Sequence, residues 1–308
     1  MKRVLFAGEI NVDLVLQGYQ DFPAPGREVL VSNSELVLGS ATAIMAMGLA
    51  RLGTPVAFAG KVGDDLWGRY CLEDMAARGI DLSRVAHGSG LKTGVTVSIT
   101  HPGDRALVTY LGAIAALTGA DVPDAAMRGH DHLHVSSFFF QDGLRPDVPD
   151  LFARAHGLGL TTSLDTGFDP SGRWDGGLRE ALRETDLFFP NEVELEALSG
   201  CSDPEAGLRR LTAGRTRVAA KLGEHGAMAL DGEALVRVPA YRVATLDTTG
   251  AGDSFNAGFL HRWLEGAPLV DCLRLGAACG ALSTRALGGT AAQPTLAEAE
   301  ALVRSGER

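Results

Sequence analysis

The sequence predicts an α/β fold, a doubly wound and mostly parallel sheet with a small β lid. Short apolar runs alternate with amphipathic helical patterns from one end of the chain to the other. Such alternation is typical of a parallel sheet that helices cover on both faces. Two segments interrupt the alternation with strand-like pieces and turn-forming residues, which predicts a second, smaller sheet. We find no internal repeat and no linker that would mark a second independent domain.

The elements of the large sheet follow from these patterns. Strands are expected at residues 4–7, 56–62, 132–136, 161–165, 187–189 and 218–222. Helices are expected at residues 41–51, 66–78, 148–156, 178–184, 192–198, 251–264 and 269–285. In sheets of this kind ligands bind beyond the carboxyl ends of the strands, so the loops after the strands are where we look for a site.

The interrupting segments predict the lid. Residues 11–38 contain strand-like pieces at 14–16, 28–31 and 35–38 around a Pro-Ala-Pro-Gly loop, and residues 93–100 and 106–110 flank the turn signal His-Pro-Gly-Asp. The predicted division assigns to the lid residues 11–38 and 91–112, and to the nucleotide- and substrate-binding body residues 1–10, 39–90 and 113–308. The lid covers a ligand site, pairs two chains into a homodimer, or does both.

Composition excludes several classes of protein. The 308 residues carry a formal net charge of −10 without a block of like charge, so neither nucleic acid nor an anionic membrane is an expected partner. Four scattered cysteines without a C-x-x-C pair favour a reducing compartment over a zinc site. The apolar run near the N-terminus is too short for a signal peptide, and no stretch is long enough to span a bilayer. We expect a soluble, cytoplasmic protein.

The most informative motif is residues 247–255, Asp-Thr-Thr-Gly-Ala-Gly-Asp-Ser-Phe, which precede an apolar helical pattern. Two glycines at a strand-to-helix turn let successive N–H groups point into one cavity, where the helix dipole favours an anion. A phosphate bound at this turn would repel the carboxylate of Asp253, so a site for phosphate alone would not favour an aspartate here. The aspartate is explained if it faces a hydroxyl and takes the proton of that hydroxyl as the oxygen attacks a phosphoryl group. Alternatively, Asp253 only complements the helix dipole. Neither a P-loop nor a G-x-G-x-x-G motif is present.

Together with Ala-Gly-Phe at 257–259, this string resembles the second signature of the ribokinase-like carbohydrate kinases, the phosphofructokinase-B family. The resemblance covers nearly the whole chain and includes residues 8–13, 50–53, 60–65, 191–194 and 221–223. It implies an α/β body with a β lid, ATP and Mg²⁺, and transfer of the γ-phosphoryl group to a hydroxyl, by expectation a primary one, of a small-molecule sugar or sugar derivative.

The resemblance also implies roles for individual residues. Asp253 corresponds to the catalytic base, and Gly250, Ala251 and Gly252 correspond to the anion hole. The substrate-binding positions are Asn11, Asp13, Gly39, Ser40 and Asp253. The nucleotide-binding positions are Asn191, Glu194, Lys221, Gly223, Gly250 and Gly252. Glu194 is implied to act on Mg²⁺ through water, and Asp247 and Thr249 resemble the monovalent-cation loop of some members, for which K⁺ is the expected ion.

Structural interpretations of the same residues stay open. Asp13 also suits the close of a turn after the first strand. Asn191 followed three residues later by Glu194 is a capping box, which is compatible with a role at the metal. Lys221 is also explained as an exposed lysine at a strand end. The chain departs from the family pattern at Ser40, where a second glycine is usual, and at Ile44 and Ala277, where asparagine is frequent.

Other residues carry weaker signals. His130, His132 and His134 could present a metal site on one face of a strand, although no carboxylate or cysteine completes it. Substrate contact and packing are equally plausible for Arg105, Tyr110 and Gln141. Because Ile44 removes a polar group near the sugar pocket, a nucleoside or vitamin-alcohol kinase of the same fold is an alternative. A catalytically silent ligand sensor is a further alternative, and a hydride-transfer enzyme is disfavoured by the missing dinucleotide motif.

Overall fold

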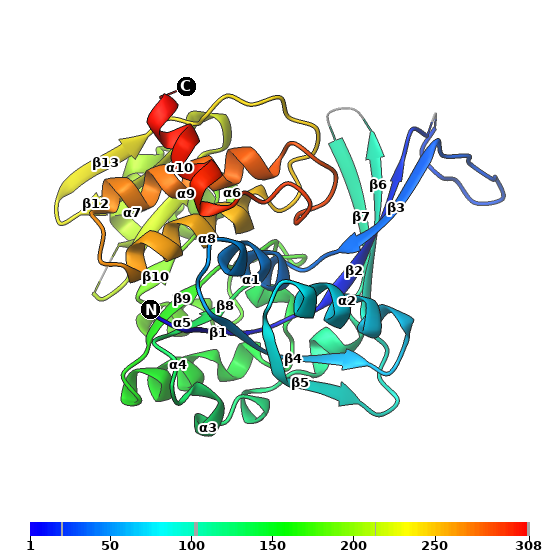
Figure 1. Cartoon of the computed structure of the whole chain (residues 1–308), viewed down its shortest axis with the longest axis horizontal. Helices are drawn as coiled ribbons and strands as arrows, with labels where there is room; N and C mark the ends of the chain where they lie inside the picture. Colours follow the sequence, from blue (N-terminus) through cyan, green and yellow to red (C-terminus); the bar gives the residue numbers. More distant parts are fainter. Residues whose placement is uncertain (20, 102–103, 213, 307–308) are drawn as a thin grey trace.

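Two separate sheets organise the computed structural model: a nine-stranded sheet within the helical body, and a four-stranded sheet that stands off to one side (Figure 1). The structure describes residues 1–19, 21–101, 104–212 and 214–306, and of residues 100, 101, 104 and 105 it describes the backbone alone. Among these residues, no helix combines the length and the apolar character that crossing a membrane requires.

The large sheet has the strand order β13-β12-β11-β10-β9-β8-β1-β4-β5. Its strands are β1 Val4–Ala7, β4 Val56–Gly63, β5 Asp81–Gly88, β8 His132–Val135, β9 Thr161–Leu164, β10 Leu187–Phe188, β11 Arg217–Lys221, β12 Ala227–Asp231 and β13 Ala234–Val238. Neighbours from β5 to β11 pair in parallel, and β12 and β13 pair antiparallel at one edge. The predicted doubly wound, mostly parallel sheet is confirmed.

Helices cover both faces of this sheet. They are α1 Ala41–Arg51, α2 Leu66–Ala77, α3 Asp124–Met127, α4 Val148–Gly157, α5 Leu178–Arg183, α6 Glu192–Ser199, α7 Pro204–Leu211, α8 Ala251–Leu264, α9 Leu269–Ser283 and α10 Leu296–Ser305. Short 3-10 helices are η1 Gly112–Ala116, η2 Gly119–Asp121, η3 Phe138–Phe140, η4 Arg145–Asp147 and η5 Gly223–His225. Because side chains alternate along a strand, Val4 and Phe6 of β1 pack with α1, α2, α8 and α9, whereas Leu5 and Ala7 pack with α3 to α7.

The small sheet has the order β3-β2-β6-β7. Its strands are β2 Asn11–Gln17, β3 Asn33–Leu38, β6 Gly94–His101 and β7 Asp104–Tyr110. β2 begins soon after β1 ends, pairs antiparallel with β3 and pairs in parallel with β6, which places Asp13 opposite Thr96. The expected turn at 102–103 lies outside the described residues. The predicted strand at 28–31 is wrong, because the β2–β3 ladder ends at Gln17 and Asn33 and leaves that segment without a partner strand.

Several elements were not predicted. The edge hairpin of β12 and β13 turns at Gly232 and Glu233, and the preceding Asp-Gly dipeptide is a hairpin signal that could have revealed it. β5, α7 and α10 were also missed. All of them lie at the margins of the large sheet or on its outer surface, so their omission leaves the arrangement of strand ends around the site unchanged.

Candidate active site

Two cavities open beside the N-terminus of α8. The first, which we call the lid-side cavity, has a volume of about 760 Å³ and is walled by the four-stranded sheet, by loops that follow strands of the large sheet, and by α1 and α8. The second, the C-terminal cavity, has a volume of about 860 Å³ and lies between η5, residues 239–245, α8 and α9. Both fall within the range of roughly 300–1,000 Å³ that is usual for small-molecule sites.

The first turn of α8 separates the two cavities. Residues of this one turn divide between the two walls: the lid-side cavity receives Thr249, Gly250 and Asp253, and the C-terminal cavity receives Thr248, Ala251 and Gly252. A group bound at the N–H groups of the turn would therefore be reached from both sides. This division is the geometry that a transfer between two bound molecules needs.

Glycine is required at the start of this helix. Gly250 caps α8 with a φ of 71°, in the left-handed region. A Cβ at that position would lie 2.6 Å from the Cα of Gly289 and 2.9 Å from Cγ2 of Ile44. Gly250 is therefore needed both for its backbone conformation and for the close approach of the loop at Gly289.

Asp247 fixes the segment that leads into the turn. Its Oδ1 accepts hydrogen bonds from the backbone N and the Oγ1 of Thr249, at 2.9 and 2.7 Å, and its Oδ2 accepts one from the N of Gly288 at 2.9 Å. The carboxylate thus joins the turn to the loop that follows α9. The role of Asp247 and Thr249 in holding K⁺ stays a prediction.

The carboxyl group of Asp253 lies in the first turn of α8 and lines the lid-side cavity. Burial, and next to it the negative charge of Asp165, raises the pKa of Asp253 well above the usual value for aspartate. A carboxylate with a raised pKa is a stronger proton acceptor, which suits a general base.

Three predicted substrate-binding residues meet where β2 begins and β3 ends. The Nδ2 of Asn11 donates to Oδ1 of Asp13 at 2.8 Å, and Thr96 of β6 is 3.4 Å from the same Nδ2. A Cβ on Gly39 would lie 2.1 Å from Oδ1 of Asp13, so glycine makes room for this pair. Asn11 and Asp13 line the lid-side cavity together with Asp253.

Ser40 adopts a backbone conformation that favours glycine. Its φ is 73°, a left-handed conformation that costs energy for a residue with a side chain. Its Oγ caps α1 by accepting from the N of Ala43 at 3.1 Å, and donates to the backbone O of Glu9 at 2.5 Å. These two hydrogen bonds offset the strain.

Glu9 is a lid-side residue that sequence reasoning missed. It is buried, lines the lid-side cavity and accepts hydrogen bonds from the N of Thr42, at 3.1 Å, and from the Oγ1 of Thr42. A carboxylate two residues after the end of β1 was the available signal, because the carboxyl ends of the strands form the site.

One part of the lid-side cavity wall is apolar. Ile44 packs against the glycine turn, and Phe140 and Phe168 form part of the same wall. Phe168 is 66% exposed, yet its ring contacts Trp174 edge-on at a centroid distance of 6.5 Å, and Trp174 contacts Phe139 at 5.7 Å. An aromatic face therefore stands fixed at the cavity.

Lys221 provides positive charge on the other side of the turn. It ends β11 and lines the C-terminal cavity together with Gly223 and Ala277. Its Nζ lies 3.4 Å from where a Cβ on Gly252 would stand, and it donates to Oδ2 of Asp165 at 2.7 Å. Lys221 is therefore a largely buried, paired lysine, so the interpretation as an exposed strand-end lysine is wrong.

Asn191 and Glu194 form the capping box that their spacing predicts. Oδ1 of Asn191 accepts from the N of Glu194 at 2.9 Å, and Oε2 of Glu194 accepts from the N of Asn191 at 2.8 Å. Burial, followed by the charge of Asp165, raises the pKa of Glu194 to about 7. Neither residue is among the described residues that line the two cavities.

The histidines of β8 are structural. His132 bonds Thr161 and Ser163 at 2.8 and 2.6 Å, and His134 bonds Ser163 and Ser136, both at 2.6 Å. Each buried ring nitrogen thus has a hydroxyl partner. In the described part of the chain, no group of three His, Cys, Asp or Glu side chains is arranged to hold a metal ion. The metal interpretation of this tract is wrong.

Two of the three weaker substrate candidates lie away from the cavity wall. Gln141 is fully buried and its Nε2 donates to the backbone O of Ser136 at 2.5 Å, which is a packing role. Tyr110 is 55% exposed and is not among the described residues that line the lid-side cavity. The side chain of Arg105 lies outside the described residues.

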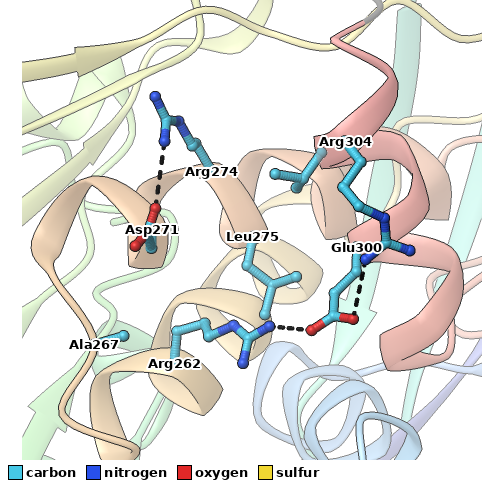
Figure 2. Close-up of a pocket in the computed structure, with 8 residues that line it drawn as sticks. Arg262, Ala267, Asp271, Arg274, Leu275, Glu300 and Arg304 are labelled. Carbon is cyan, nitrogen blue, oxygen red and sulfur yellow. Dashed lines mark hydrogen bonds and ion pairs between the residues drawn. The ribbon is translucent and has the colours of Figure 1, made fainter.

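A third cavity, of about 320 Å³, lies at the far end of α8, between α8, α9 and α10 (Figure 2). Arg262 and Arg304 both pair with Glu300, and Arg274 pairs with Asp271 at 3.3 Å. Because each of these guanidinium groups already has a carboxylate partner, the cavity offers little net charge to a ligand.

The sequence and fold of this chain are similar to those of known carbohydrate kinases. The model of the pfkB family carbohydrate kinases matches residues 1–296. An ATP-dependent ribose-1-phosphate kinase of Halopiger xanaduensis is 31% identical over 95% of both chains, and an uncharacterized sugar kinase of Archaeoglobus fulgidus is 33% identical over 75% of this chain and 91% of its own. A putative ribokinase II of E. coli, solved in complex with ATP and Mg²⁺, superposes with a TM-score of 0.84 at 25% identity over 99% of this chain and all of that one. The chain belongs to the pfkB family of carbohydrate kinases.

Proposed function

We propose that this kinase transfers the γ-phosphoryl group of ATP to a primary hydroxyl of a sugar or sugar derivative, with Asp253 as the general base. The observation that carries the proposal is the first turn of α8, whose residues line both cavities. An acceptor in one cavity and a nucleotide in the other would meet at the N–H groups of this turn.

The lid-side cavity is the proposed acceptor site. Asp13 and Asn11 would bind vicinal hydroxyls, because a carboxylate and an amide offer several acceptor and donor positions to a polyol. The backbone at Gly39 and Ser40 would complete the contact. Asp253, which lines the same cavity from α8, would accept the proton of the hydroxyl that attacks.

The C-terminal cavity is the proposed ATP site, supported by its size, by the ammonium group of Lys221 and by the open backbone at Gly223. The related E. coli structure contains ATP and Mg²⁺. Glu194 does not line this cavity and its Oε2 accepts from the N of Asn191, so it would act on Mg²⁺ only through water, of which this ion keeps several. When bound, Mg²⁺ neutralises charge on the phosphates.

The chain's own residues would perform the remaining chemistry. The hydroxyl oxygen attacks the γ-phosphorus, the bond from that phosphorus to the bridging oxygen of ADP breaks, and the hydroxyl proton passes to a carboxylate oxygen of Asp253. N–H groups of Gly250, Ala251 and Gly252 would stabilise the charge on the transferred group. Closure of the four-stranded sheet as a lid over the cavity would exclude water and limit hydrolysis of ATP.

A nucleoside is the second candidate acceptor. The apolar wall that includes Ile44, Phe140 and Phe168 favours it, because a flat base packs well on an aromatic face. The departure at Ile44, which replaces a polar side chain of the family pattern, acts in the same direction.

A homodimer formed through the lid is proposed as well. β7 is an edge strand of the small sheet, and Leu107 and Val108 on it are 56% and 61% exposed. Exposed apolar edge strands tend to pair with a second chain. Light scattering of the wild type and of Val108→Lys tests this: a dimer that the lysine dissociates supports the proposal, and a monomeric wild type contradicts it.

ADP release from ATP and Mg²⁺, measured with sugars, nucleosides and pyridoxal, tests the activity, and ³¹P NMR identifies the phosphorylated product. We expect a primary phosphate ester of at least one sugar or nucleoside. Ligands that raise the melting temperature without any phosphorylated product would instead support the silent-sensor alternative. A product from pyridoxal alone would support the vitamin-alcohol alternative.

A further inference from the structure

Asp165 is a buried carboxylate that the function described so far does not use. It follows β9 directly, at the carboxyl ends of the strands where the site lies, and is 4% exposed. Its Oδ2 accepts two hydrogen bonds, from Nζ of Lys221 and from Nδ2 of Asn256, both at 2.7 Å. Its Oδ1 accepts a third, from the N of Gly167 at 2.9 Å.

This single oxygen connects the two elements that meet at the transfer point. Lys221 is the last residue of β11, and Asn256 lies one turn into α8, three residues after Asp253. Nζ of Lys221 stands beside Gly252 of the predicted anion hole. Any shift of Asp165 would therefore move the ammonium group relative to the N–H groups of the α8 turn.

We propose that Asp165 is the positioning residue that holds the ammonium group of Lys221 at the anion hole, and that Lys221 then contacts the phosphoryl group in transit; this rests on the proposed kinase function. Lysine carries three N–H donors. One is directed to Asp165, and its side chain keeps 13% exposure toward the C-terminal cavity. The remaining donors are available to phosphate oxygens.

The electrostatics of the cluster agree with this role. Burial opposes the ionisation of Asp165, yet the charge of Lys221 and the hydrogen bonds hold the pKa of Asp165 below its usual value. Burial likewise opposes the charge on Lys221, yet Asp165 and Glu194 raise the pKa of that lysine. Both groups are therefore charged at neutral pH, and each keeps the other in place.

A purely structural ion pair makes a different prediction from a positioning one. Removing the carboxylate also removes repulsion toward phosphates, so the affinity for ATP does not distinguish the two. The turnover number does, because a displaced ammonium group stabilises the transition state less well even when ATP is bound.

The test is a double-mutant cycle of Asp165→Asn and Lys221→Met, assayed at saturating ATP with the acceptor that the wild-type enzyme phosphorylates in the ADP-release assay. We expect kcat of D165N to fall on the order of tenfold or more, with the acceptor KM unchanged. We also expect D165N to add little once K221M is present. The inference would be overturned if D165N and K221M lower kcat equally and their effects add in the double variant, or if D165N keeps the wild-type kcat.

A pH profile supplies a second readout that structural damage would not imitate. The charged groups that act on the pKa of Asp253 are Asp165, Lys221, Glu9 and Glu194. Because the negative charge of Asp165 raises that pKa, D165N should move the acid limb of kcat/KM to lower pH, whereas K221M should move it to higher pH. If the acid limb of kcat/KM stays at its wild-type pH in both D165N and K221M, the proposed role of Asp165 is contradicted.

Matched variants separate this outcome from misfolding. Asp186→Asn alters a carboxylate that accepts from the N of Thr162 at 2.8 Å. Asp186 comes just before β10, so it lies at the amino ends of the parallel strands, away from the site at their carboxyl ends. The substitution should leave kcat unchanged.

If D165N does not fold, Asn256→Ala removes only the second donor to the same oxygen of Asp165. A smaller loss of kcat is then expected, and no loss would overturn the inference. A wild type that forms no product refutes the proposed function itself.

Discussion

The two cavities beside α8 differ in how their walls are built. The lid-side cavity presents polar side chains from several elements, among them Glu9, Asn11, Asp13 and Asp253, against an apolar wall. The C-terminal cavity presents mostly small residues, with the largely buried ammonium group of Lys221 beside Gly252. Polar side chains select a ligand by its own pattern of donors and acceptors, whereas a glycine-rich turn offers only backbone N–H groups to an anion. The lid-side cavity is thus where acceptor choice would be set, and the shared turn is where the chemistry would be constant.

The strongest test of this contrast is Asp253→Asn, which keeps the shape of the shared turn but removes the base. We expect kcat to fall about 10²- to 10⁴-fold while both ligands still bind. Steady-state kinetics and calorimetric binding of the acceptor measure the two effects separately. Near-normal turnover would show that Asp253 only complements the helix dipole.

Gly250→Ala should damage both cavities at once, because the added Cβ would stand 2.6 Å from Gly289 in a left-handed conformation. Displacing one anion-hole donor is expected to lower kcat by about 10². The melting temperature should also fall, and Gly266→Ala is a control for the conformational part alone, since Gly266 has a φ of 77° and open space around it. Similar turnover in both variants would argue against the anion hole.

Asp13→Ala should affect the lid-side cavity alone. A lost hydrogen bond to a charged group corresponds to a rise in the acceptor KM of about 10- to 100-fold. The KM for ATP should stay at its wild-type value. If both KM values rise together, the two cavities are not the separate sites proposed here.

The pH dependence should reflect the raised pKa of Asp253. The base acts when it is ionised, so kcat/KM is expected to fall about tenfold per unit as pH drops through that pKa, well above the range of an ordinary aspartate. Glu194, whose pKa is about 7, is a second candidate for this limb. An acid limb that persists in Glu194→Gln assigns it to Asp253, and an acid limb near pH 4 contradicts the raised pKa.

The smallest effect is expected at the third cavity. Arg274→Ala removes one surface ion pair at the far end of α9 from the transfer point, and exposed pairs of this kind contribute about 0–1 kcal/mol to stability. Neither KM nor kcat should change. A change in either constant would mean that this cavity communicates with the site.

Local sequence rules predicted the glycine turn and the helix after it, but the expected strand before the turn is wrong, because β13 ends at Val238 and residues 239–247 form no strand. The two glycines, the aspartate and the apolar helix after them lie within one short segment, so the spacing of the residues alone defines the geometry. The conformation of Gly250, the capping box of Asn191 and Glu194, and the meeting of Asn11 with Asp13 all follow from contacts between near neighbours in the chain or at strand ends.

The buried partners could not be predicted in the same way. Asp165 and Lys221 are 56 residues apart, and Asp165 and Asn256 are 91 apart, so only the strand order of the sheet brings them together. Their residue types are ordinary for loops and helix surfaces. The edge hairpin of β12 and β13 was missed for a different reason, because its alanine-rich first strand lacks the β-branched residues that mark a strand.

A crystal structure with a non-hydrolysable ATP analogue and the acceptor tests the central claim most directly. The account predicts the γ-phosphate at the N–H groups of the first α8 turn, entering from the C-terminal cavity, and an acceptor hydroxyl from the lid-side cavity within hydrogen-bonding distance of Asp253. A triphosphate bound away from this turn, or an acceptor whose hydroxyl groups all lie beyond reach of that carboxylate, would contradict it.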